Sequence, residues 1–420
     1  MNWISQLQRG EKVTLGACFA GYAMDSFDFM IYTFMIPTLV VIWHMSKSEA
    51  GLIATGALLS SAVGGWFAGV LSDKYGRVRM LQVTIGWYCL FTFLSGLTHS
   101  PGQLFVTRAL QGFGMGGEWS VGSVLIAEMI RPEHRGKAVG LVQSSWAAGW
   151  GLAAIMYGVT FSFIPEAIAW RVLFFLGVVP AVLIVIVRRN VKEPVVYLET
   201  RRKVDAGQLH ANFLRIFSPS VLSTTIFASL VATGAQGGYY GVNTWLPTYL
   251  KTVRNLSVFN TSSYLVVLIT GSFVGYLLGA YASDRIGRRI TFVIFAVVST
   301  IIVTTYMLLP ITNWQMLILG FPLGMGNSGI FGGMGAFFSE LYPNEIRGSG
   351  QGFCYNFGRA IGAIFPALIG FLSARMGLGR AIGIFGAGAY AVLVIATLCL
   401  PETRGKRLQE EIQVEKATPA

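Results

Sequence analysis

The chain has 420 residues, of which 54% are hydrophobic and only 12% charged, a composition too apolar to close the surface of a soluble globular protein. Its 31 Lys and Arg residues outnumber 19 Asp and Glu residues, which in a soluble protein would raise the possibility of nucleic-acid binding. The basic residues instead concentrate in the loops and tails on one side of the predicted spans, which is typical of membrane proteins and places both termini in the cytoplasm.

Twelve stretches are long and apolar enough to cross the hydrocarbon core as helices, for which about 20 residues are needed. A basic hydrophilic stretch at 188–219 separates the sixth from the seventh, so we expect an all-α membrane protein with six-helix bundles at 1–187 and 220–401 and a cytoplasmic tail at 402–420. The predicted spans cover residues 13–43, 50–72, 80–98, 103–129, 137–162, 168–188, 221–250, 259–282, 290–310, 314–338, 349–374 and 381–400.

Two carboxylates lie in the middle of the first span. Asp25, Asp28 and Tyr32 are spaced by three and then four residues, so all three project from one stripe of a helix. A charge in hydrocarbon is costly, and an intramembrane acid is therefore a functional candidate by default. We expect this stripe to face a polar cavity.

The fourth span carries a second charged stripe, formed by Arg108, Gln111, Met115 and Glu118. Arg108 and Glu118 are about 15 Å apart along the helix axis, too far for a direct ion pair. Arg108 could form a structural ion pair with an acid of the first span. A second role, in proton coupling, is implied by the family resemblance given below, and both roles stay open.

Glycines also gather in the fourth span. Little side-chain bulk on a membrane helix predicts close backbone approach of a neighbouring helix. We expect that neighbour to be the first span, which would bring its aspartates within reach of Arg108 or Glu118. The glycines are Gly112, Gly114, Gly116 and Gly117.

The eleventh span holds Tyr355, Asn356 and Arg359 on one face, close to mid-span. A buried guanidinium needs a carboxylate partner, and every intramembrane acid that we identify lies in the first half. Arg359 is therefore expected either to bind a substrate carboxylate with its planar fork or to form a structural ion pair across the two halves.

Polar and aromatic residues at helical spacing accompany these charges. A cleft with one arginine, several amides and flat rings suits a small carboxylate, especially one that carries an aromatic or sugar ring. The alternative is that the aromatic residues only pack against neighbouring helices. The further candidates for substrate binding are Gln143, Trp146, Gln236, Tyr239, Tyr240, Asn243 and Asn327, together with Tyr32.

One loop motif occurs in both halves, at an offset of 211 residues. It reads Asp73-Lys-Tyr-Gly-Arg77 after the second span and Asp284-Arg-Ile-Gly-Arg288 after the eighth. Each arginine can pair with an acid at a neighbouring helix end, which would hold the cytoplasmic side shut, or it can merely contact anionic lipid headgroups. The residues that we expect to act in this gate are Asp73, Arg77, Glu128, Arg135, Asp284, Arg288, Glu340 and Arg347.

The repeated Asp-Lys/Arg-x-x-Gly-Arg loop resembles the signature of the major facilitator superfamily, as do the twelve spans and the Pro401-Glu-Thr-Arg-Gly405 ending. The resemblance implies two six-helix bundles related by an axis along the membrane normal. It also implies a substrate site between the bundles, near the midplane.

Within the superfamily, Asp25-Ser-Phe-Asp28 and Gly114-Met-Gly-Gly-Glu118-Trp119 resemble the aromatic-acid/proton and sialate or lactate/proton symporters. Their first-span pattern is typically Asp-Gly-x-Asp, and Ser26 replaces that glycine here. The resemblance implies proton-coupled uptake of a small organic anion in a bacterial inner membrane, by a monomer that is not an enzyme.

Asp25, Asp28, Arg108 and Glu118 are the expected proton-coupling residues, and Asp28, nearest mid-span, is the preferred proton carrier. No metal-ligand cluster and no phosphate-binding loop is visible, so we expect no metal, no cofactor besides the proton and no nucleic-acid partner. Proton-driven efflux of drugs or metabolites is the alternative within transport, and a non-transporting membrane sensor is the alternative from another class.

Overall fold

A computed structural model describes residues 2–130, 132–179, 181–182, 191–193, 197–198, 213–342 and 346–404. These residues form helices and no strand. The first half contains α1 (Asn2–Gln6), α2 (Arg9–Ile42), α3 (Lys47–Tyr75), α4 (Arg77–Gly96), α5 (Pro101–Met129), α6 (Pro132–Phe163) and α7 (Glu166–Leu176). The second half contains η1 (Phe213–Phe217), α10 (Leu222–Thr252), α11 (Val258–Arg285), α12 (Arg288–Leu308), α13 (Asn313–Leu341), α14 (Arg347–Gly362), α15 (Ile364–Met376) and α16 (Leu378–Leu398).

Each predicted span contains a described helix. The eleventh is divided at Ala363 into α14 and α15, and the end of the sixth lies outside the described residues. By length and composition, six of the described helices qualify as membrane spans, beginning at Arg9, Lys47, Asn260, Arg288, Ser349 and Leu378. Most of the central loop predicted at 188–219 and the tail from 405 onward also lie outside the described residues.

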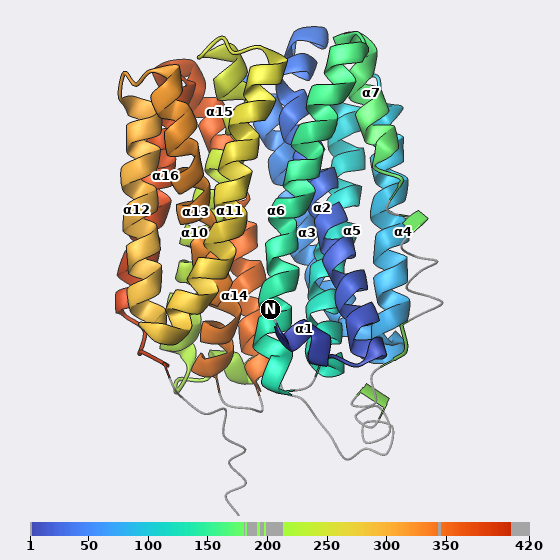
Figure 1. The fold of residues 1–420 in the computed structure, drawn as a ribbon, viewed down its shortest axis with the longest axis vertical. Coiled ribbons are helices and arrows are strands. Elements are labelled where there is room, and N and C mark those ends of the chain that lie inside the picture. The colour runs from blue at the N-terminus through green and yellow to red at the C-terminus, as the bar shows by residue number, and fades with distance from the viewer. Residues whose placement is uncertain are drawn as a thin grey trace, which may run out of the picture.

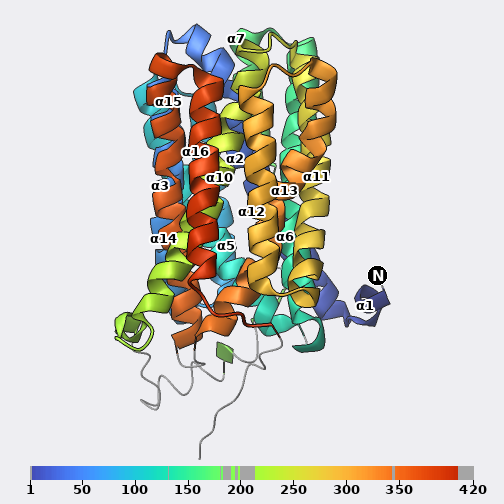
Figure 2. The same ribbon diagram turned by 90° about the vertical axis from the view of Figure 1, so that its left-hand side faces the viewer.

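The two halves stand side by side as two bundles of roughly parallel helices (Figure 1). Helix α6 of the first half packs on α11 of the second, α3 packs on α14 and α15, and α2 packs on α10 (Figure 2). The N terminus lies at one end of the bundles, which we call the N-terminal face, and the loop that precedes α7 lies at the opposite face. The helix pairs that join the two halves therefore run between these two faces.

The surface and the interior reverse the pattern of a soluble protein. Large apolar side chains such as Trp66, Ile301 and Ile395 are 57%, 59% and 63% exposed, whereas Asp25 and Arg108 are fully buried. An apolar exterior is stable only against lipid, where every helix also satisfies its own backbone hydrogen bonds. The fold is that of a membrane protein whose polar groups face inward.

The glycines of α5 do allow close helix packing, but the neighbours differ from the expected one. A Cβ atom on Gly112 or Gly116 would strike backbone carbonyls of α3, and one on Gly114 or Gly117 would strike α4. The predicted approach of the first and fourth spans is confirmed, since Asp28 and Arg108 meet at 3.6 Å. The prediction that the glycines cause it is wrong, because the charged stripe of α5 faces α2 instead.

The repeated loop turns on a glycine in each half. Gly76 has φ of 102° and Gly287 has φ of 110°, a region that only glycine adopts without strain. A Cβ atom on Gly76 would also collide with the carboxylate of Glu193, which caps the start of α4. The motif thus requires this glycine both for the turn and for the cap.

We expect Gly76→Ala to lower the stability of the protein by roughly 1–3 kcal/mol, because alanine is strained at this φ and displaces the cap. The midpoint of thermal unfolding in detergent measures the effect. Gly69→Ala is the matched control, since a Cβ atom there meets nothing within 4 Å and alanine favours the helix. Equal midpoints for the two variants would contradict the expectation.

Candidate functional site

The acid and the arginine of the first half form a buried ion pair. Arg108 Nη1 lies 3.6 Å from Asp28 Oδ1, both side chains are fully buried, and the amide of Gln111 donates a hydrogen bond to Asp28 Oδ2. Arg108 also donates to the backbone carbonyl of Asp28 at 3.4 Å. Of the two roles open for Arg108, the structure contains the ion pair with the first span.

Tyr32 belongs to this ion-pair cluster. The guanidinium of Arg108 lies 5.6 Å from the centroid of the Tyr32 ring, and the Tyr32 hydroxyl donates to the carbonyl of Ala50 at 2.8 Å. Its described contacts are thus with α5 and α3. The predicted role of Tyr32 in substrate binding stays a prediction.

Asp25 and Glu118 are the buried acids without a salt bridge in the described structure. Both carboxylate oxygens of Asp25 and Oε2 of Glu118 are buried without a hydrogen-bond partner. Asp25 lies within electrostatic range of Glu118, Asp28 and Arg359. A carboxylate left without hydrogen bonds in such a site is costly, so these two groups are suited to take up a proton.

Arg359 on α14 is the counterpart of these acids in the second half. It is 2% exposed, and its Nε and Nη1 atoms have no hydrogen-bond partner. The guanidinium lies 5.1 Å from the centroid of the Tyr355 ring, with Tyr240 also beside it. No described carboxylate lies within ion-pair distance of Arg359, which leaves its fork available to an anion.

Aromatic rings from both halves surround this region. Tyr22 on α2 lies 4.7 Å from Trp119 and 5.1 Å from Trp146, measured between ring centroids, and Trp119 lies 6.0 Å from Tyr355. Trp146 Nε1 donates a hydrogen bond of 2.7 Å to the hydroxyl of Tyr239, across the boundary between the halves. We call these rings, which reach from Tyr22 to Tyr355 beside Arg359, the aromatic walls.

Tyr22, Phe29 and Trp119 are absent from the candidates named in the sequence analysis. Phe29 packs edge-on against Tyr240 at 5.6 Å. Tyr22 precedes Asp25 by three residues and so shares its helical stripe, and Trp119 directly follows Glu118. The spacing of Tyr22 is a signal that could have identified it.

The predicted amides contribute unpaired groups. Gln236 donates to the carbonyl of Tyr355 at 2.8 Å, and Asn356 donates to that of Gly352 at 3.0 Å. Asn327 accepts a hydrogen bond of 2.9 Å from Tyr390. The amide atoms that are buried without a partner belong to Gln143, Gln236, Asn243, Asn327 and Asn356. Such atoms can be satisfied by a polar ligand or by water.

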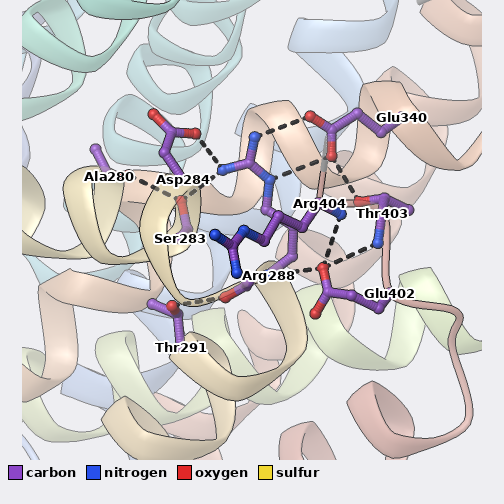
Figure 3. Close-up of polar contacts among 10 residues, drawn as sticks. Ala280, Ser283, Asp284, Arg288, Thr291, Glu340, Glu402, Thr403 and Arg404 are labelled. Carbon is purple, nitrogen blue, oxygen red and sulfur yellow. Dashed lines mark hydrogen bonds and ion pairs between the residues drawn. The ribbon is translucent and has the colours of Figure 1, made fainter. Parts of the chain in front are cut away.

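The repeated loops form equivalent ion pairs near the N-terminal face. Arg288 contacts Glu340 at 2.9 Å and Asp284 at 2.5 Å (Figure 3), and Arg77 contacts Glu128 at 3.3 Å. Each pair joins helices of the same half, so these contacts do not themselves tie the two halves together. The side chains of three other predicted gate residues, Asp73, Arg135 and Arg347, lie outside the described residues.

Two further glutamates complete these loops, and the sequence analysis missed them. Glu193 accepts hydrogen bonds from the backbone N–H groups of Arg77 and Val78, and Glu402 does the same for Arg288 and Arg289. Partial burial raises the pKa of Glu402, but four backbone N–H donors outweigh it and hold the pKa below its usual value. The cap on α12 is therefore ionised at neutral pH and is lost only on acidification.

Polar contacts between the halves occur toward the face opposite the N terminus. The hydroxyl of Thr55 donates to the carbonyl of Ala363 at 2.6 Å, and Lys251 forms an ion pair with Glu166 at 3.0 Å. These contacts join α3 to the junction of α14 and α15, and α10 to α7. The boundary between the halves is closed on that side of the aromatic walls.

The residues that the structure describes contain no group of three or more His, Cys, Asp or Glu side chains that could hold a metal ion. One buried cation, two buried acids without a salt bridge and several aromatic rings can bind an anion and exchange protons.

Comparison with known proteins agrees with this arrangement. The family model for the Major Facilitator Superfamily matches residues 18–312 and 262–419. The chain is 39% identical over 418 residues to a "Probable 4-methylmuconolactone transporter" of Cupriavidus pinatubonensis, covering 100% of this chain and 97% of the relative. It is 28% identical to a "Cis,cis-muconate transport protein" of Acinetobacter baylyi, covering 93% and 94% of the two chains.

Among solved structures, the fold is similar to the inward open conformation of the xylose transporter XylE from E. coli, with a TM-score of 0.74. The match covers 94% of this chain and 97% of that one at 16% identity. A likeness at this identity concerns the fold alone, which is the two-bundle architecture expected from the repeated loops.

We expect Asp28→Asn to lower the thermal stability of the protein and Asp25→Asn to leave it unchanged or raised. The first substitution leaves the buried Arg108 without its countercharge, which costs about 3–5 kcal/mol for a broken buried pair, whereas the second neutralises a carboxylate that has no partner. Thermal unfolding in detergent at neutral pH compares the two. An equal loss in both variants would show that the ion pair is not what distinguishes these aspartates.

Proposed function

Because the chain belongs to the major facilitator superfamily, we propose that it takes up a small ring-bearing monocarboxylate together with protons, by alternating access between its two bundles. The observation that carries this proposal is Arg359, a buried cation with unpaired donor atoms among aromatic rings from both halves. A guanidinium in this position gains most from an anionic ligand, since it has no protein carboxylate in the described site.

The substrate is a monoanion because Arg359 is the one cation with unpaired donor atoms and no salt bridge in the described part of the binding region. While ionised, Asp25 and Glu118 would repel a second carboxylate. The unpaired carbonyl oxygen of Gln236 suits a hydroxyl donor instead, and the unpaired amide of Asn243 suits an uncharged polar group. The aromatic walls suit a flat ring. The relative named for 4-methylmuconolactone supports a substrate with a ring, and the one named for muconate supports organic acids more broadly.

Asp25 and Glu118 are the proton carriers of this proposal. Asp28, the residue preferred from the sequence, pairs with Arg108 and accepts a hydrogen bond from Gln111, and both contacts favour its ionised form. Asp25 and Glu118 lack such contacts for most of their oxygens, and Asp25 lies within electrostatic range of both Glu118 and Arg359. Their neutralisation by protons would remove the charges that oppose closure around a bound anion.

The transport cycle follows from these charges. The N-terminal face is taken as cytoplasmic, so the contacts of Thr55 and Lys251 close the external side. When the substrate leaves Arg359 and protons leave the acids, Arg359 and Asp25 can attract one another across the boundary. Two forms of the carrier can then change conformation without an unpaired charge in the boundary. One has substrate and protons bound, and the other is empty with Arg359 and Asp25 paired.

We expect Arg359→Ala to abolish binding of benzoate-type and nicotinate-type monocarboxylates, and Arg359→Lys to weaken it at least about tenfold because lysine lacks the planar fork. Binding of benzoate, nicotinate, lactate, sialic acid and muconolactone to purified protein at acidic and neutral pH tests this and identifies the ligand. Arg375→Ala is the control, because Arg375 lies on the exposed end of α15. Unchanged binding in Arg359→Ala would move the anion site elsewhere.

We expect Asp25→Asn and Glu118→Gln to lose proton-driven accumulation in proteoliposomes while they retain exchange of labelled for unlabelled substrate. Exchange needs only the loaded carrier to change conformation, whereas accumulation needs protons to bind and leave. Full accumulation in both variants would exclude them as proton carriers. Exchange without any response to a proton gradient in the unaltered protein would reject symport, and export from inverted vesicles would favour efflux.

A further inference from the structure

The carboxyl group of Glu118 is seated against a glycine of the neighbouring helix. A Cβ atom on Gly21 of α2 would collide with Glu118 Oε1, and its next nearest atoms would be Glu118 Cδ at 3.2 Å and Oε2 at 3.7 Å. All three nearest atoms therefore belong to one carboxyl group. The missing side chain at position 21 leaves a notch that this carboxyl group occupies.

Other glycines at helix contacts differ in what they face. A Cβ atom on Gly149 of α6 would strike the backbone of Ala23, and one on Gly112 would strike the backbone of Ala57. Those glycines let two helix backbones approach. Gly21 instead makes room for a functional side chain, so helix packing alone does not explain it.

We propose that Gly21 is a positioning residue that holds the carboxyl group of Glu118 against α2, beside Asp25, and thereby sets the pH at which the carrier binds and releases its coupling proton. The inference rests on the proposed role of Glu118 as a proton carrier. It adds a residue that has no ionisable group of its own and that acts through the shape of the helix surface.

The notch opens beside both the acids and the aromatic wall. Tyr22 follows Gly21 and Trp119 follows Glu118, and their rings pack in a tilted arrangement with centroids 4.7 Å apart. The segments Gly21–Tyr22 and Glu118–Trp119 thus position both the proposed proton site and one wall of the proposed substrate site. A displacement of the Glu118 carboxyl group would move it out of a seat in which its Oε2 atom is buried without a hydrogen-bond partner.

The Glu118 carboxyl group interacts electrostatically with titratable groups on the surrounding helices. These groups and the notch together determine the pH at which it binds a proton. Asp25 is an acid within electrostatic range that lacks a salt bridge in the described structure, and Arg359 of the second half acts on Asp25 in turn. The titratable groups in the described structure that interact electrostatically with Glu118 are Cys18 and Asp25 on α2 and Tyr88 and Cys89 on α4.

Gly21→Ala tests the inference through the pH dependence of uptake. The added methyl group displaces the carboxyl group into more polar surroundings, where its charged form is better accommodated, so it should release its proton more readily. We expect the pH of half-maximal proton-driven uptake to move by about one unit toward acid, a tenfold change in proton affinity. Gly16→Ala on the same helix is the matched control, because a Cβ atom there meets nothing within 4 Å.

A second substitution should reverse the effect. Aspartate is shorter than glutamate by one methylene group, about 1.5 Å, so Glu118→Asp leaves room for a methyl group at position 21. We expect the double variant Gly21→Ala/Glu118→Asp to have the same pH profile as Glu118→Asp alone. If Gly21→Ala shifts the profile equally with either acid at position 118, or lowers the maximal rate without shifting the profile, the inference is wrong.

Folding and function can be separated in this design. If Gly21→Ala cannot be recovered as folded protein, the double variant Gly21→Ala/Glu118→Ala decides the matter, because it lacks the colliding carboxyl group. The inference requires that this double variant folds as well as Glu118→Ala. If the double variant also fails to fold, Gly21 has a packing role and the inference is wrong. If Glu118→Gln retains full proton-driven accumulation, the proposed role of Glu118 fails. If Glu118→Gln abolishes it and Gly21→Ala matches Gly16→Ala, only the role of Gly21 fails.

Discussion

The free-energy cost of an unpaired charge in hydrocarbon is the constraint on which the arrangement of this protein depends. Arg108 and Asp28 meet that cost within the first half by pairing with each other, out of contact with lipid. Arg359 has no described carboxylate to pair with, although it is as deeply buried. Arg108 is therefore part of a buried ion pair, whereas Arg359 is the cation for which we propose an anionic ligand.

The helix contacts follow the same constraint. The glycines of α5 let α3 and α4 pack close against two of its sides, which leaves the charged stripe facing α2. The notch at Gly21 then receives the Glu118 carboxyl group, while Asp28 receives Arg108 two turns away along the same pair of helices. Glu118 on α5 and Asp28 on α2 thus acquire different surroundings through contacts between the same two helices.

The loops near the N-terminal face serve stability first. Each arginine of the repeated motif ties together helices of its own half, and Glu193 or Glu402 caps the helix that begins at that arginine. Each half is thereby a rigid unit at this end, as rocking of one bundle against the other requires. The closed contacts on the opposite side, at Thr55 and Lys251, are the ones that must break for the carrier to open there.

Much of the fold could be predicted from the sequence, because a span is a local property of about 20 residues and the repeat of the loop motif requires only two matching segments. Asp25, Asp28, Arg108, Glu118 and Arg359 were identifiable for the same reason, since a charge within an apolar run is conspicuous by itself. The orientation of the α5 glycines was not, because an α-helix with small residues on several faces does not reveal which neighbour each face meets.

Pairing was decided by the tertiary structure. Sequence spacing places Asp25 and Asp28 on one stripe, yet only the packing of α5 on α2 gives Asp28 an arginine and leaves Asp25 without one. The seat of Glu118 likewise depends on a missing side chain 97 residues away in the chain. Local hydropathy thus determined which charges are buried in the membrane, whereas contacts between distant segments decided which of them are neutralised and which remain available for function.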